Sequence, residues 1–245
     1  MQSRIPRIST RGFYDLGSGR KLKSRPYDVY PTKFFKTLDG IPEITIMIHG
    51  LRNNKSGALT KFSIAQSRLR QLGYGSPVVG FSYDSNTKGV QYRSCEKKAT
   101  DVGRTIARKN GYNLAMFILD MKRKFPHLKI RLMGHSLGSE VIVHTLANLA
   151  HHRNVVESVH FFGASVPADW IGTKKFGAIL QKTVKQKITN YYSPHDGVLK
   201  YAYESMLIEK PLGYLGISGK SLPKYEQKKT FPRNHRFVSY VAVLK

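Results

Sequence analysis

The chain of 245 residues is long enough for one α/β domain with a sizeable core, and its 40% hydrophobic and 23% charged residues are ordinary for a globular protein. Its charge is unusual, because 41 Lys and Arg against 15 Asp and Glu give a net charge of +26. Such a charge favours binding to polyanions, anionic surfaces or anionic substrates, and the alternative interpretation is a solvated basic surface without a partner. A single cysteine excludes an internal disulfide framework, and since no secretory leader or membrane-spanning apolar window is recognisable, we expect a cytoplasmic protein.

Residues 1–40 differ from the rest and form a basic N-terminal arm with interleaved aromatic side chains. Such a composition suits nucleic-acid binding or an organelle transit peptide. No nucleic-acid-binding motif accompanies the charge. We therefore favour an arm whose aromatic residues pack on the domain, with an early hairpin around residues 26–30.

The following domain, residues 41–245, opens with an almost wholly apolar run that predicts a strand buried on both faces and ends at His49-Gly50. Apolar spacing predicts the elements that follow it. In order, we expect a strand at 44–48, a helix at 62–72, a strand at 77–83 and a long helix at 97–125, with a kink or break at Asn110-Gly111.

The second half of the chain continues the alternation of strands and helices. We expect strands at 128–133, 158–164 and 188–192, helices at 138–151 and near 173–183, and a terminal helix from about 235. The Gly/Pro-rich stretch 210–234 predicts a connection, within which 210–216 would be a mobile cover. Alternation of this kind predicts an α/β fold with a mostly parallel central sheet and helices on both faces.

One pentapeptide, Gly134-His135-Ser136-Leu137-Gly138, carries the clearest chemical signal. It lies between a predicted strand and a predicted helix, which is the setting of a nucleophile elbow. In such an elbow, a strained turn lifts the serine hydroxyl above the sheet. Ser136 is therefore the candidate nucleophile.

The elbow, the His49-Gly50 loop and the chain order serine, acid, histidine resemble the α/β-hydrolases over about residues 41–245. The Gly-His-Ser-Leu-Gly form is especially similar to lipases and carboxylesterases. The resemblance implies an α/β-hydrolase fold and a serine hydrolase activity. Because large caps are often inserted between strands in this family, the short connection from 164 to 188 implies little or no cap domain.

The acid and the base follow from position in the chain. Asp196 stands just beyond a late strand in a tight turn, and His235 is the one histidine after it. An alternative acid is Asp169, after the preceding strand, in which case His195 would be the fallback base. We favour Asp196 with His235.

An oxyanion hole needs two backbone N–H groups. The first is expected from Leu137, directly after the nucleophile and at the start of a helix. By resemblance to lipases, the second comes from Leu51, with His49 ordering that loop.

These residues predict a serine hydrolase that cleaves carboxylic esters, as a carboxylesterase or lipase does, through a Ser-His-Asp triad and an acyl-enzyme. A lactonase or an acyl-thioesterase would use the same triad. A polyanion- or membrane-binding protein on a hydrolase scaffold is the hypothesis from another class. No cofactor and no metal are expected, since neither a cysteine set nor an H-x-x-x-H pair is present.

Overall fold

A computed structural model describes residues 5–172, 175–217 and 220–244. One eight-stranded sheet forms its centre, in the order β2-β1-β4-β3-β5-β6-β7-β8, and all neighbouring strands run parallel except β1 and β2. The strands are β1 (Arg7–Ser9), β2 (Asp28–Tyr30), β3 (Glu43–Ile48), β4 (Val78–Ser82), β5 (Lys129–His135), β6 (Ser158–Phe162), β7 (Ile188–Tyr192) and β8 (Tyr225–Lys229). The predicted mostly parallel α/β sheet is confirmed.

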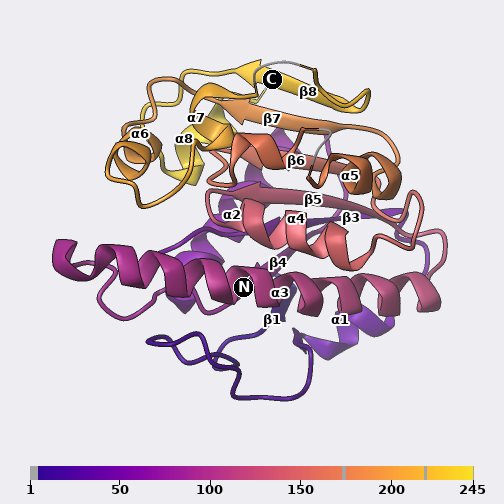
Figure 1. The fold of residues 1–245 in the computed structure, drawn as a ribbon. Coiled ribbons are helices and arrows are strands. Elements are labelled where there is room, and N and C mark those ends of the chain that lie inside the picture. Colours follow the sequence, from indigo (N-terminus) through magenta and orange to yellow (C-terminus); the bar gives the residue numbers. More distant parts are fainter. Residues whose placement is uncertain (1–4, 173–174, 218–219, 245) are drawn as a thin grey trace.

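Helices cover both faces of this sheet, with α3, α4 and α5 in front of it and α2 behind it in Figure 1. The helices are α1 (Thr32–Lys36), α2 (Lys55–Gln71), α3 (Glu96–Lys124), α4 (Gly138–Asn148), α5 (Gly177–Thr183), α6 (Gly197–Glu204), α7 (Leu212–Leu215) and α8 (Phe237–Ala242). Two short 3-10 helices occupy Arg93–Cys95 and Ala168–Trp170. Among the described residues, no helix is both long and apolar enough to cross a membrane.

The core has a part on each face of the sheet. The central strands are buried over nearly their whole length, since β3 and β4 carry only one residue that is not buried, Glu43. On one face they pack against α3 and α4, and on the other against α2 and α8, where Phe62 and Phe237 are buried. Strands covered on both sides need continuous apolar runs, which explains why β3 and β4 could be predicted from their composition.

The long helix α3 is continuous through Asn110 and Gly111, so the expected break does not occur. Both residues are buried. A Cβ on Gly111 would lie 2.5 Å from the Cβ of His144, so the glycine lets α3 approach α4 closely. The glycine therefore serves helix packing.

The N-terminal arm contributes two strands to the sheet. Strand β1 pairs parallel with β4, with Ile8 opposite Phe81, and β2 pairs antiparallel with β1. The strand at 28–30 therefore pairs with residues far back in the arm, and not within a tight hairpin at 26–30 as expected. The arm side chains of Phe13 and Phe35 are buried in the core.

Two segments between 210 and 234 differ from the expected loop and cover. Leu212 is fully buried, and the N–H groups of Leu212 and Gly213 each donate to a carbonyl 2.8 Å away, those of Val166 and Ala164. This anchoring does not fit a mobile cover. Strand β8 forms the edge of the sheet, where its polar sequence faces solvent on one side and gives no apolar period.

Candidate active site

The nucleophile candidate Ser136 lies at the turn between β5 and α4. Its φ of 53° is in the left-handed region, a strained conformation for a side chain other than glycine. The flanking glycines allow this turn, because a Cβ on Gly134 would lie 2.6 Å from Ile142 and one on Gly138 would lie 2.5 Å from the carbonyl oxygen of Ile48. The local structure is therefore a strand, a strained serine and a helix, with no room for a side chain at either flanking glycine.

The structure brings Ser136, His235 and Asp196 together. The Oγ of Ser136 lies 3.0 Å from Nε2 of His235, and Nδ1 of His235 lies 2.6 Å from Oδ2 of Asp196. Asp196 follows β7 as the N-cap of α6, and His235 precedes α8. Parallel strands bring their carboxyl ends to one edge of the sheet, which is why residues 60 and 39 positions apart in sequence converge there.

Asp196 is almost fully buried, at 2% exposure, and each oxygen of its carboxylate accepts two hydrogen bonds. Its Oδ1 accepts the N–H groups of Val198 and Leu199 at 3.1 Å each, and its Oδ2 accepts the hydroxyl of Tyr240 at 2.6 Å as well as His235. Burial raises the pKa of Asp196. The hydrogen bond and the charge of His235, and the hydrogen bonds from Tyr240 and Leu199, lower it by more, so the pKa lies below its ordinary value. The acid is therefore ionised beside His235.

Tyr240 is a partner that sequence reasoning missed. It is fully buried in α8, and its ring packs so closely on Gly163 that a Cβ there would lie 2.9 Å away. Nothing in the sequence links it to Asp196. The one feature that could have drawn attention to Tyr240 is its hydroxyl, which stands among apolar residues of the predicted terminal helix.

His135, the residue before the nucleophile, is a second partner that was missed. Burial, and then the neighbouring His235, hold its pKa well below the ordinary value, so the ring is neutral. Its Nε2 lies 2.7 Å from the backbone carbonyl oxygen of His235, which can only accept, so Nε2–H donates. His135 thus ties the segment that carries His235 to the end of β5.

The two expected oxyanion donors belong to segments that border Ser136, since Leu137 follows it directly in the chain. A Cβ on Gly50 would come 2.9 Å from the Cβ of Ser136, so the loop that carries Leu51 is in contact with the nucleophile. Within the described residues, the N–H groups of Leu51 and Leu137 donate no hydrogen bond. Their side chains both pack toward Gly103 of α3. An oxyanion hole requires N–H groups that are not already used in the fold, and these two meet that condition among the described residues.

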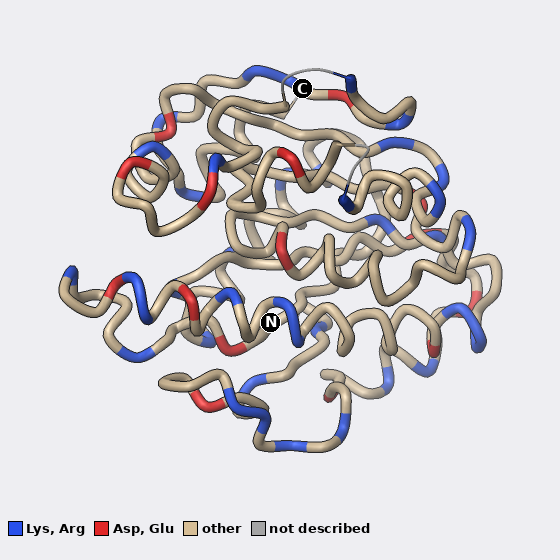
Figure 2. Tube along the Cα trace, viewed as in Figure 1, with Lys and Arg blue, Asp and Glu red and all other residues tan. Residues whose placement is uncertain are grey.

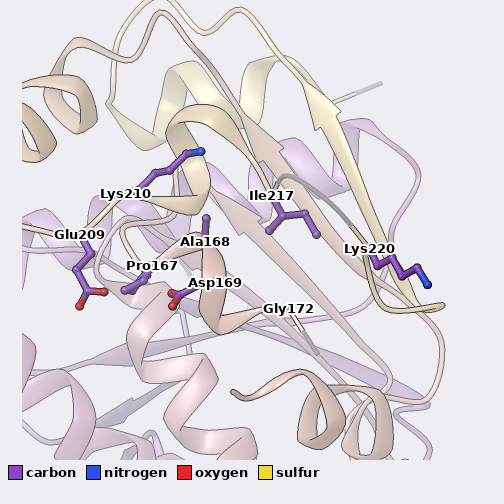
Figure 3. Close-up of a pocket in the computed structure, with 8 residues that line it drawn as sticks. All are labelled: Pro167, Ala168, Asp169, Gly172, Glu209, Lys210, Ile217 and Lys220. Carbon is purple, nitrogen blue, oxygen red and sulfur yellow. The ribbon is translucent and has the colours of Figure 1, made fainter. Parts of the chain in front are cut away.

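The alternative acid Asp169 is not brought to His235. Its carboxylate pairs with Lys175 at 2.6 Å, and its side chain is 60% exposed. Figure 3 shows it lining a pocket, together with residues that include Glu209 and Lys210. This pocket has a volume of about 240 Å³, and its lining does not include Ser136, Asp196 or His235. His195, the fallback base, has its ring centroid 5.9 Å from that of Phe231.

The described residues contain no group of three or more His, Cys, Asp or Glu side chains that could hold a metal ion. Among the other histidines after Ser136, His144 and His160 have packed surroundings, whereas His151 and His152 are exposed. His144 packs edge-on against Trp170 and Phe176, and burial lowers the pKa of His160 to about 3.

The model of a family described as "Alpha/beta hydrolase of unknown function (DUF900)" matches residues 32–230, a range that includes Ser136 and Asp196 and ends before His235. No curated protein matches the sequence.

Several solved structures are similar in fold. TT1662 from Thermus thermophilus is 14% identical, with a TM-score of 0.50 over 82% of this chain and 84% of that protein. A cutinase-like protein from Cryptococcus sp. is 13% identical, with a TM-score of 0.44 over 82% and 86% of the two chains. A lipase-esterase related protein from Clostridium acetobutylicum is 13% identical, with a TM-score of 0.42 over 82% and 90%.

Proposed function

The chain belongs to the α/β-hydrolase family DUF900, and from this premise we propose that it is a serine hydrolase of carboxylic esters. The observation that carries the proposal is the continuous hydrogen-bonded line from Ser136 Oγ through His235 to Asp196, with distances of 3.0 and 2.6 Å. A serine hydroxyl is a poor nucleophile unless a base takes its proton, and this line supplies the base and the group that orients it.

In the proposed mechanism, Ser136 attacks the acyl carbonyl while Nε2 of His235 accepts the hydroxyl proton. Asp196 holds the proton of Nδ1, which fixes the tautomer that leaves Nε2 free to act as the base. The oxyanion that forms accepts hydrogen bonds from the N–H groups of Leu51 and Leu137, and the start of α4 adds the favourable end of its dipole. His235 then donates the proton to the leaving alkoxide, and water, activated by the same histidine, releases the acid.

The substrate class that we propose is a small or medium-sized carboxylic ester, with lactones and acyl-thioesters as variants that the same triad would cleave. Only two short helices, Ala168–Trp170 and α5, are described between β6 and β7, so little of the chain is available there to cover the site. A site without a cap inserted between these strands suits small or medium-sized esters that enter from solvent.

The second candidate function is binding of a polyanion, and the distribution of charge favours it. Figure 2 shows Lys and Arg along most of the trace with few acidic residues between them. Several of the acids are occupied by ion pairs, such as Glu43 with Arg131 and Glu140 with Arg104. Salt-dependent binding to RNA that is unchanged in Ser136→Ala would support this function.

The proposal is tested by hydrolysis of a panel of p-nitrophenyl esters, lactones and acyl-thioesters by the wild type and Ser136→Ala. We expect turnover of at least one class by the wild type, and loss of it in the variant with an unchanged melting temperature. Turnover that survives in Ser136→Ala would overturn the assignment of the nucleophile.

A further inference from the structure

Arg11, in the N-terminal arm, uses all three of its guanidinium nitrogens on one neighbouring region. Its Nε donates to the hydroxyl of Ser82 at 3.0 Å and its Nη1 to the carbonyl of Asn53 at 2.9 Å. Its Nη2 donates to Nε2 of His49 at 3.1 Å and to the carbonyl of Asn54 at 3.2 Å. Three of these four acceptors belong to the loop 49–54, which follows β3 and carries Leu51.

The arm holds Arg11 in this position through a buried carboxylate. Asp84, which follows β4, accepts the backbone N–H groups of Gly12, Phe13 and Tyr14 at 3.0, 3.1 and 3.1 Å. Asp84 is 5% exposed, and the next arm side chain, Phe13, is fully buried. Three charge-assisted hydrogen bonds to one carboxylate fix the backbone immediately after Arg11.

The contact with His49 determines which ring nitrogen carries the proton. A guanidinium cannot lose its proton in a protein and can only donate, so Nε2 of His49 must accept. The N–H of Tyr83 donates to the same nitrogen at 3.2 Å. The proton of the neutral ring is therefore on Nδ1, which lies 3.0 Å from the carbonyl oxygen of Gly50 and donates to it.

That carbonyl belongs to the peptide unit whose N–H is the N–H of Leu51. Asn53 also donates to the carbonyl of Gly50, at 2.9 Å, so two donors hold the oxygen. In a trans peptide the C=O and the N–H point in opposite directions. Fixing the oxygen of Gly50 toward His49 and Asn53 therefore directs the N–H of Leu51 to the other side, where Gly50 lies against Ser136.

We propose that Arg11 is a positioning residue of the oxyanion hole. Through Arg11, the N-terminal arm orients the loop 49–54 and so contributes to the active site. The inference rests on the proposed hydrolase function and adds to it a residue far outside the elbow. Arg11 lies before the residues that the family model matches, 32–230, so this contribution comes from a part of the chain that the family match leaves out.

The test is steady-state hydrolysis by Arg11→Met with Arg25→Met as its matched control. Arg25 is in the same arm, pairs with Asp28 at the surface with a 57% exposed side chain, and does not contact the loop 49–54, so its replacement removes the same charge. Loss of one oxyanion donor lowers kcat by about 10²–10³-fold, so a misdirected N–H of Leu51 should lower the kcat of Arg11→Met by up to about 10²-fold. KM should stay close to that of the wild type, because the interaction is made with the oxyanion of the transition state.

Arg11→Lys keeps the charge and the stem but cannot reach all four acceptors, so we expect a kcat between those of Arg11→Met and the wild type. An Arg11→Met variant with the kcat of Arg25→Met, or one changed in KM alone, would overturn the inference. If Arg11→Met does not fold, Arg11→Lys decides, since a kcat equal to that of the wild type would then overturn it. Failure of the proposed function is distinguishable, because the wild type itself would then show no turnover that depends on Ser136.

Discussion

Removing the hydroxyl of Tyr240 isolates the contribution of one hydrogen bond to the buried acid. In Tyr240→Phe the ring keeps its packing against Gly163, and only the 2.6 Å hydrogen bond to Oδ2 of Asp196 is lost. A hydrogen bond to a charged group contributes about 1.5–3 kcal/mol to stability, so the free energy of unfolding near neutral pH should fall by about that amount. Equilibrium unfolding in urea measures it directly.

The pH dependence of this loss has a definite sign. The folded-state pKa of Asp196 is lowered, so the stability that its ionised form contributes is present above the unfolded pKa and is lost as pH falls through the folded pKa. The difference between the wild type and Tyr240→Phe should therefore shrink as the pH is lowered into the range where Asp196 is protonated.

Tyr83→Phe is the matched control for this experiment. Tyr83 is also fully buried, but within the described residues its hydroxyl has no hydrogen-bond partner. Removing an unsatisfied buried hydroxyl costs nothing or stabilises. Equal losses of stability in Tyr240→Phe and Tyr83→Phe, or a loss in Tyr240→Phe that does not change with pH, would refute the reasoning.

Three further predictions concern the packing and the site. Gly111→Ala should lower the melting temperature, because the new Cβ would lie 2.5 Å from His144, and overpacking of about 1–3 kcal/mol exceeds the roughly 1 kcal/mol that alanine gains over glycine in a helix. Arg104→Met should lower the free energy of unfolding by about 3–5 kcal/mol, since it leaves the buried carboxylate of Glu140 unpaired, and adding Glu140→Gln should recover most of the loss in a urea titration. Asp196→Asn should lower kcat by roughly 10⁴-fold in ester hydrolysis while the protein stays folded, and a loss under about tenfold would contradict the role of the acid.

Sequence patterns predicted the strands that are buried on both faces and the helix with a long apolar stripe. Strands β3, β4 and β7 and the helix α3 have apolar runs or stripes, and the structure has them within one or two residues of the expected ranges. The edge strand β8 was missed because its Glu-Gln-Lys-Lys sequence carries no apolar period. Its strand conformation depends on pairing with β7, which lies more than thirty residues earlier and gives no local signal.

The residues of the candidate site likewise fall into those that could be predicted from the sequence and those that could not. Ser136, Asp196 and His235 could be named because each stands at a recognisable place, an elbow, a strand end and the entry to a helix. Tyr240, His135 and Arg11 could not, because their relevance comes from contacts across the fold. A positioning residue needs only the right donor in the right place, which no spacing in the sequence encodes.

The most direct measurement of the central claim is mass spectrometry of the protein after treatment with a fluorophosphonate, with His235→Ala treated in parallel. An activated serine displaces the fluoride and keeps the phosphonyl group, so the account predicts one adduct per chain, on the peptide that contains Ser136. His235→Ala retains the serine but lacks the base, and it should label far more slowly. An unlabelled wild-type chain, or an adduct on a residue other than Ser136, would contradict the account.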